Sequence, residues 1–114
     1  MNIPSDAVIP SAKLNRYLLV KQVRNDKSKF LAQAGFTLNN YTALKKALRE
    51  LVLTNEAIED RTEEYGTYYQ VTGLLKGLNG VDLDVVTIWL ERKIDKQFQF
   101  VTLLPNKTKL RQVN

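Results

Sequence analysis

The stretch Thr67–Leu90, TYYQVTGLLKGLNGVDLDVVTIWL, determines the predicted fold. Apolar and polar residues alternate on both sides of Asn79-Gly80, and this two-residue period is typical of β-strands. An Asn-Gly pair favours a type I′ hairpin turn, because both central positions of that turn need a positive φ. We therefore predict two antiparallel strands joined at Asn79-Gly80. The second half of the later strand is apolar on both faces, which indicates a central position in the sheet.

The residues before this hairpin have the periodicity of helices. The predicted helices run from Ala12 to about Val20–Gln22, over Lys27–Ala34 and over Tyr41–Leu53. In the first helix, Leu14, Tyr17 and Leu18 share one apolar face. The third helix has the clearest apolar stripe at positions i, i+3, i+4 and i+7, formed by Leu44, Ala47, Leu48 and Leu51.

The remaining segments complete a sheet. Ala57–Thr62 lies in an acidic run and is predicted as a charged edge strand; the alternative is that the third helix continues through Glu59. Phe98–Leu104 alternates as a last strand, which Pro105 ends. We therefore predict one α+β domain over residues 1–114, with three N-terminal helices packed on a three- to four-stranded antiparallel sheet. Residues 1–10 form an extended lead-in, and residues 106–114 form a basic flexible tail.

The chain contains neither cysteine nor histidine. This composition excludes thiol catalysis, disulfides, the Ser-His-Asp arrangement and histidine or cysteine metal sites. Any catalysis must use Asp, Glu, Lys, Arg, Tyr, Ser or Thr. No run reaches the roughly 18 apolar residues of a membrane span. Met1–Lys13 also lacks the basic region and apolar run of a signal peptide, so we expect a cytoplasmic protein with no membrane partner.

A basic surface is the first candidate site. The net charge is +5, and residues 1–53 hold nine Lys or Arg side chains against three acidic ones. If the helices present these charges on one face, they can contact the phosphates of RNA. The alternative is that the helices carry their charges to solvent, as surface helices usually do.

Tyrosine and threonine side chains on the predicted sheet are the second candidate. Tyr65, Tyr68 and Thr72 can share one face or its rim, with Thr87 and Thr102 on neighbouring strands. Lysine, tyrosine and threonine can cleave RNA without histidine, since a cation stabilises the phosphorane charge and a hydroxyl moves protons. The alternative is that these residues are present because they are good strand formers.

Acidic residues give weaker signals. Asp82 and Asp84 have the spacing that puts both carboxylates on one strand face, as a divalent cation would need. Two carboxylates after a turn are more often solvated, so we expect no metal and no cofactor. The acidic run Glu56–Glu64 is better read as a solvated edge or a docking site for a basic partner. The glycines are scattered, and no phosphate-binding loop occurs.

The order of short motifs resembles a family of small bacterial proteins of unknown function. The pattern Ile-Pro-x-x-Lys-Leu-x-x-Tyr-Leu-Leu occurs at residues 9–19, and Lys27, Phe30-Leu31 and Gly35-Phe36 match its next segment. The later matches are Leu44, Ala47-Leu48, Tyr65-Gly66, Gly73, Val85 to Trp89, and Val101-Thr102 with Pro105. The resemblance covers about residues 9–105.

This resemblance implies a layout similar to the toxin ribonucleases related to RelE and the colicin nucleases. It suggests a toxin-like ribonuclease or toxin–antitoxin component acting on RNA, with a small protein partner such as an antitoxin. The chain departs from the family pattern at three positions. The family often has a basic residue at the position of Tyr68, Arg at the position of Gln99 and Tyr at the position of Leu104. The candidate catalytic residues that remain are Lys13, Tyr17, Lys27, Tyr65, Thr87 and Thr102.

A nuclease and a binding module predict different arrangements of these residues. A nuclease needs Lys13 or Lys27 in one concave cluster with Tyr65 and Thr102. The alternative is a non-catalytic protein-binding module, which docks a partner through its sheet edge or its basic helical face. Such a module would show the same residues dispersed and an exposed apolar or charged patch.

Overall fold

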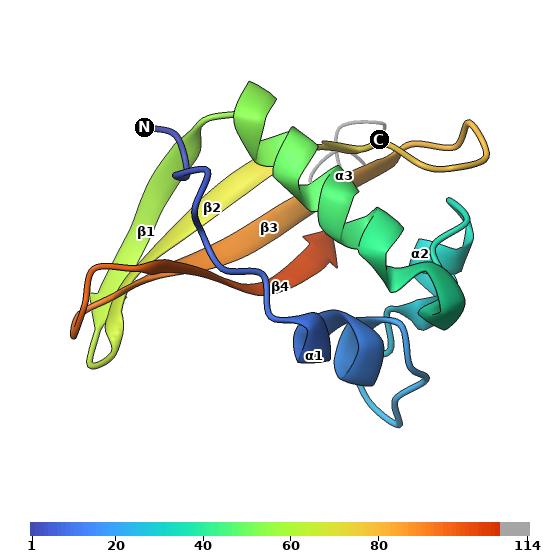
Figure 1. Ribbon diagram of the computed structural model, residues 1–114, viewed down its shortest axis with the longest axis horizontal. Coiled ribbons are helices and arrows are strands. Elements are labelled where there is room, and N and C mark those ends of the chain that lie inside the picture. Colours follow the sequence, from blue (N-terminus) through green and yellow to red (C-terminus); the bar gives the residue numbers. More distant parts are fainter. Residues whose placement is uncertain (108–114) are drawn as a thin grey trace.

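A computed structural model describes residues 1–107, and the larger part of the predicted tail lies outside this range. The strands form one antiparallel sheet in the order β1-β2-β3-β4 (Figure 1). Their bounds are Ala57–Glu63 (β1), Gly66–Leu75 (β2), Leu83–Arg92 (β3) and Phe98–Pro105 (β4). The predicted antiparallel sheet is therefore confirmed, with four strands and with the later hairpin strand in the interior.

The helices differ more from the prediction. One is long, α3 (Tyr41–Thr54), and a 3₁₀ turn, η2 (Leu38–Asn40), leads into it. The other two are short: α1 (Ser11–Lys13), which continues as a π-helical turn, η1 (Leu14–Leu18), and α2 (Ser28–Ala32). The prediction of three N-terminal helices is therefore confirmed only in part: helical segments lie near each predicted range, but α3 alone is long among residues 1–107. Since α3 ends at Thr54, the alternative in which it continued through Glu59 is wrong.

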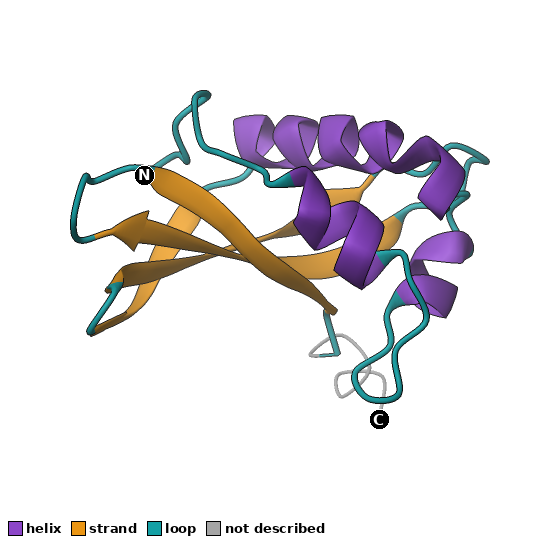
Figure 2. Ribbon diagram, turned by 60° about the horizontal axis from the view of Figure 1, so that its bottom comes forward, coloured by secondary structure: helices purple, strands orange, loops and turns teal. Residues whose placement is uncertain are grey.

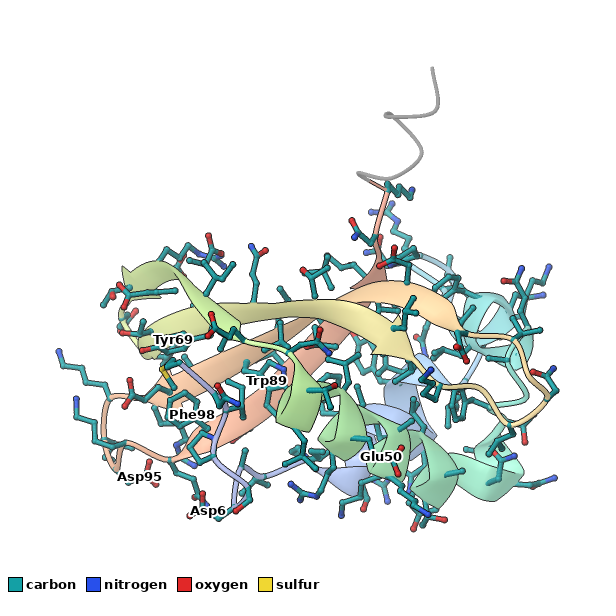
Figure 3. All side chains as sticks on the ribbon, turned by 90° about the horizontal axis from the view of Figure 1, so that it is seen from above. Asp6, Glu50, Tyr69, Trp89, Asp95 and Phe98 are labelled. Atoms are coloured by element: carbon teal, nitrogen blue, oxygen red, sulfur yellow. The ribbon has the colours of Figure 1, made fainter. Side chains whose placement is uncertain are left out.

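All helices gather on one side of the sheet, and α3 lies across it (Figure 2). The predicted stripe of α3 is buried and packs on the inward residues of the strands, which alternate with exposed ones. Tyr69, Trp89 and Phe98 lie on the side of the sheet that faces α3 (Figure 3). The Trp89 and Phe100 rings meet edge to face with centroids 5.3 Å apart. The opposite face of the sheet carries exposed Thr72, Leu74 and Leu104.

The first ten residues extend from the start of β1 to β4 and bond to both strands. Val8 pairs with β4, because its N–H donates to the Phe98 carbonyl and its carbonyl accepts from the Phe100 N–H, both at 2.8 Å. Ile3 and Ile9 are buried in the core. The lead-in therefore covers one end of the β4 edge.

The connection between β2 and β3 is not a two-residue type I′ turn. Gly80 has a φ of 85°, but Asn79 is not among the residues with positive φ in the described chain. Asn79 instead uses its side chain: Nδ2 donates to the Gln33 carbonyl at 3.0 Å, and Oδ1 accepts from the Val81 N–H at 3.1 Å. The connection is therefore longer than predicted, and it docks on the residues that follow α2.

Candidate functional site

Three of the predicted site residues meet beside β4. A hollow of about 250 Å³ is lined by Lys13, Tyr17, Leu18, Val101 and Thr102. We call it the Lys13 hollow. It combines one ammonium group with a phenol and an aliphatic hydroxyl. Its two walls come from α1–η1 and from β4.

The π-helical turn η1 sets the helical wall of the Lys13 hollow. Its signature is the Leu19 N–H donating to the Leu14 carbonyl, five residues back, at 3.0 Å. Leu14 and Leu18 are buried and anchor the turn, whereas Tyr17 is 63% exposed. Single π-turns inserted in helices often occur at functional sites. Tyr17 is thus exposed on a turn that the buried Leu14 and Leu18 hold in place.

A β-bulge sets the other wall. Ile88 pairs with Thr102, but the next residue of β3, Trp89, pairs with Phe100, so Val101 is the extra residue of β4. A bulge bends its strand and re-aims side chains. Val101 and Thr102 both line the Lys13 hollow as a result.

A second hollow, of about 410 Å³, follows along the same strand. It is lined by Asn25, Asp26, Lys27, Phe30, Leu104, Pro105 and Lys107, and we call it the Phe30 hollow. Lys27, a predicted site residue, therefore lies in this neighbouring hollow and does not line the Lys13 hollow. Leu104 is two residues beyond Thr102 on β4. The two hollows thus form one row along β4.

The Asp26 carboxylate is the negative group of the Phe30 hollow. Its Oδ1 accepts hydrogen bonds from the Ser28 hydroxyl at 2.8 Å and from the Ser28 and Gln22 N–H groups, each at 3.2 Å. The hydrogen bond from the Ser28 hydroxyl is the main cause that lowers the pKa of Asp26 below its ordinary value. Asp26 therefore stays ionised and holds its loop against the start of α2.

Two predicted residues do not join either hollow. Thr87 is fully buried; its hydroxyl donates to the Val71 carbonyl and accepts from Trp89 Nε1, both at 2.8 Å. The prediction of Thr87 as a catalytic residue is wrong, because its side chain is buried in the core and its hydroxyl is already hydrogen-bonded to Val71 and Trp89. Tyr65 is 68% exposed at the turn between β1 and β2.

Tyr65 lines another hollow, of about 780 Å³. Its other lining residues are Glu64, Leu90, Arg92, Lys93, Ile94 and Gln99. This hollow lies at the turn end of the sheet. Its charges have mixed sign, and Arg92 is already paired with Asp95 at 3.5 Å. It contains one predicted residue where the Lys13 hollow contains three, so the predicted cluster of Tyr65 with Thr102 is wrong.

The acidic candidates have local partners. Asp82 accepts from Lys76 Nζ at 3.4 Å and from the Gly77 N–H at 3.3 Å, and Asp84 accepts from Asn106 at 3.2 Å. Within residues 1–107, no group of three or more Asp or Glu side chains could hold a metal ion. No helix in that range is long and apolar enough to cross a membrane.

Sequence reasoning missed most of the Phe30 hollow. Asn25 lies in the loop before α2 and has a φ of 54°, a conformation that asparagine tolerates better than most residues. Nothing local, however, indicated that this loop would face Leu104 and Pro105. That juxtaposition depends on how β4 packs beside the N-terminal helices.

Comparison with known proteins adds a family and a fold. The model of DUF6883, a domain of unknown function, matches residues 2–107. The chain belongs to this family. No curated protein sequence matches this DUF6883 chain. The predicted membership in a family of unknown function is confirmed at this level, and the individual motif matches stay predictions.

One solved structure shares the fold of this DUF6883 chain. It is described as the contact-dependent growth inhibition toxin–immunity protein complex from Klebsiella pneumoniae 342, and the TM-score is 0.66. The alignment covers 89% of this chain and 94% of that chain, at 17% sequence identity. At that identity the likeness shows a shared fold and no more.

Proposed function

We propose that this DUF6883 chain is a toxin-like ribonuclease, the RNA-cleaving component of a toxin–antitoxin or toxin–immunity pair. The observation that carries the proposal is the Lys13 hollow, where Lys13, Tyr17 and Thr102 meet from segments far apart in the sequence. A shared fold with a chain of a toxin–immunity complex supports the same class of protein. The row of hollows along β4 also offers a path for a polynucleotide.

The three side chains suit a metal-free cleavage of RNA. The 2′-oxygen attacks the adjacent phosphorus, so that a P–O2′ bond forms, the P–O5′ bond breaks and the 2′-hydroxyl proton passes to water. The Lys13 ammonium stabilises the negative charge that builds on the phosphoryl oxygens. The Tyr17 phenol donates a proton to the leaving 5′-oxygen and regains one from water. The Thr102 hydroxyl donates a hydrogen bond to a phosphoryl oxygen.

The test is induced expression in bacteria, followed by growth curves and by total RNA separated at intervals. The wild type is compared with Lys13→Ala, Tyr17→Phe and Thr102→Ala. We expect growth arrest and RNA fragmentation in the wild type. We expect each variant to cleave purified RNA about 10²- to 10⁴-fold more slowly. Circular dichroism checks that each variant is folded.

Matched controls are available for each change. Lys46→Ala removes an exposed lysine on α3, and Thr72→Ala removes an exposed threonine on β2. Tyr65→Phe changes a tyrosine that is as exposed as Tyr17, at 68% against 63%. All three should retain activity. Loss of cleavage in Tyr65→Phe with full activity in Tyr17→Phe would move the site to the hollow at the turns.

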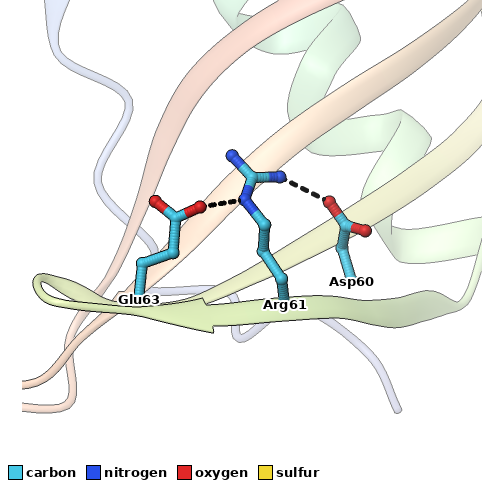
Figure 4. Close-up of polar contacts among 3 residues, drawn as sticks. All are labelled: Asp60, Arg61 and Glu63. Carbon is cyan, nitrogen blue, oxygen red and sulfur yellow. Dashed lines mark hydrogen bonds and ion pairs between the residues drawn. The ribbon is translucent and has the colours of Figure 1, made fainter.

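The exposed edge of β1 favours a second candidate, a non-catalytic binding module. All residues of β1 except Ala57 are exposed, and β2 is its one strand neighbour in the described sheet. The edge is acidic, although Arg61 pairs with Asp60 and with Glu63 (Figure 4). An open strand edge can accept a partner strand. A basic partner would suit its charge.

The two candidates differ in one pair of measurements. A binding module would leave growth and RNA intact, and it would capture a protein partner through β1. The charge reversal Asp60→Lys with Glu63→Lys should then abolish capture, whereas Asp6→Lys with Asp95→Lys, away from β1, should not. Equal capture by both double variants would exclude the β1 edge as the docking surface.

A further inference from the structure

We propose that the Phe30 hollow binds one nucleoside of the RNA strand, next to the phosphate that is cleaved in the Lys13 hollow. This inference rests on the proposed function and names a binding site beyond it. The ligand class is a single-stranded ribonucleotide whose base carries an exocyclic amino group. The argument uses the shape of the hollow, its position along β4 and its charges.

The floor of the Phe30 hollow suits the face of a base. Phe30, Leu104 and Pro105 supply an aromatic ring and two apolar surfaces, and Phe30 is partly buried against the core. Leu104 remains 43% exposed although it is a large apolar side chain. Bases of single strands stack on aromatic and apolar side chains. A volume of about 410 Å³ accommodates one nucleoside.

The spacing fits neighbouring nucleotides. Thr102 lines the first hollow and Leu104 the second, two residues along the same strand. A strand rises about 3.3 Å per residue, which separates these positions by about 7 Å. This distance is comparable to the length of one nucleotide in an extended single strand. A strand of RNA lying along β4 can therefore fill both hollows together.

The charged side chains of the Phe30 hollow have two roles: the lysines bind the phosphate, and the carboxylate binds the base. Lys27 and Lys107 supply two ammonium groups for the phosphate of the bound nucleotide. Asp26 supplies the acceptor for the base. Its Oδ1 already accepts three hydrogen bonds, and its Oδ2 accepts none from residues 1–107. Carboxylates recognise the amino group of cytosine in this way, and uracil offers no such donor.

The experiment measures nucleotide binding and does not depend on RNA cleavage. Cytidine monophosphate, uridine monophosphate and inorganic phosphate are titrated separately into the ¹⁵N-labelled full chain while amide shifts are recorded. We expect cytidine monophosphate to shift the amides of residues 25–30 and 104, and to bind about tenfold more tightly than uridine monophosphate. Asp26→Asn keeps the Oδ1 acceptor and should reduce that tenfold preference to near equality.

A second variant blocks the hollow. Leu104→Glu places a carboxylate at its floor and should weaken cytidine monophosphate binding at least about tenfold, through repulsion of the phosphate. Leu74→Glu is the matched control, since Leu74 is 46% exposed on the same face of the sheet and lines neither hollow. It should bind like the wild type.

Each outcome bears on one proposal or the other. Nucleotide binding in the Phe30 hollow without any RNA cleavage would support the subsite and overturn the ribonuclease. Cleavage that is unaffected by Leu104→Glu would overturn the subsite and leave the ribonuclease standing. Equal shifts from inorganic phosphate and from both nucleotides would overturn the nucleoside site, because they would show phosphate binding alone.

Discussion

Thr87 shows how a hydroxyl that looks catalytic in the sequence can serve the core. Trp89 Nε1 donates to its Oγ1, and both side chains are fully buried. Thr87→Val would leave the indole N–H without an acceptor, so we expect the free energy of unfolding to fall by about 1–3 kcal/mol. Urea denaturation measures this change. Thr87→Ser keeps the hydroxyl and should lose less; equal losses in the two variants would contradict the role of the hydroxyl.

The Tyr69 phenol makes stability depend on alkaline pH. Burial raises the pKa of Tyr69 above its ordinary value, and the carboxylates of Glu91 and Glu59 raise it further. Because the folded chain holds this proton more tightly, the stabilisation is complete below about pH 10 and is lost as the pH rises through the folded pKa. We expect Tyr69→Phe to lose less stability than the wild type as the pH rises above about 10 in urea titrations. Identical slopes would refute this linkage.

At the scale of elements, Asn55 and Gly73 couple the end of α3 to the last residues of β2. Asn55 Nδ2 donates to the Leu51 carbonyl at 2.8 Å and so satisfies a free carbonyl at the helix end. A Cβ at Gly73 would lie 2.6 Å from that Nδ2. Gly73→Ala must displace the Asn55 side chain, and we expect a loss of about 1–2 kcal/mol in urea denaturation. Combining Gly73→Ala with Asn55→Ala should cost less than the sum, and additive costs would disprove the coupling.

The same scale explains what the sequence could predict. Strand alternation and the α3 stripe are local patterns that burial selects directly, so β2, β3, β4 and α3 fall close to their predicted bounds. The π-turn η1 and the Asn79 contact with the end of α2 depend on tertiary packing, which no local pattern contains. Lys13 and Tyr17 are four residues apart, but the predicted apolar face of the first helix held Tyr17 with Leu14 and Leu18, and Lys13 lay off it. Thr102 lies beside Lys13 and Tyr17 only because β4 packs next to η1 and has a bulge at Val101, and neither feature follows from a local sequence pattern.

At the scale of the whole molecule, the first ten residues connect both sides of the fold. Met1 bonds to Ala57 at the start of β1, and Val8 bonds to β4. Arg49 of α3 donates to the Ala7 carbonyl at 2.9 Å. Ile3, Ala7 and Ile9 are at most 4% exposed. The segment that the sequence predicted as an extended lead-in thus contributes Ile3, Ala7 and Ile9 to the core.

Deleting residues 1–9 should therefore unfold most of the protein. Burial of each isoleucine side chain contributes about 1.5–3 kcal/mol, and a typical domain has only about 5–15 kcal/mol of stability in total. We expect the truncated chain to lose its cooperative urea transition and its dispersed amide spectrum. Ile3→Val is the mild control and should keep both, at a cost of about 1 kcal/mol. A cooperative transition at the wild-type midpoint would show that the segment only lies on the surface. Residues 1–9 lead through Pro10 into α1, which carries Lys13. Because the truncation unfolds the chain, we expect RNA cleavage to be lost with the fold and not through removal of a catalytic group.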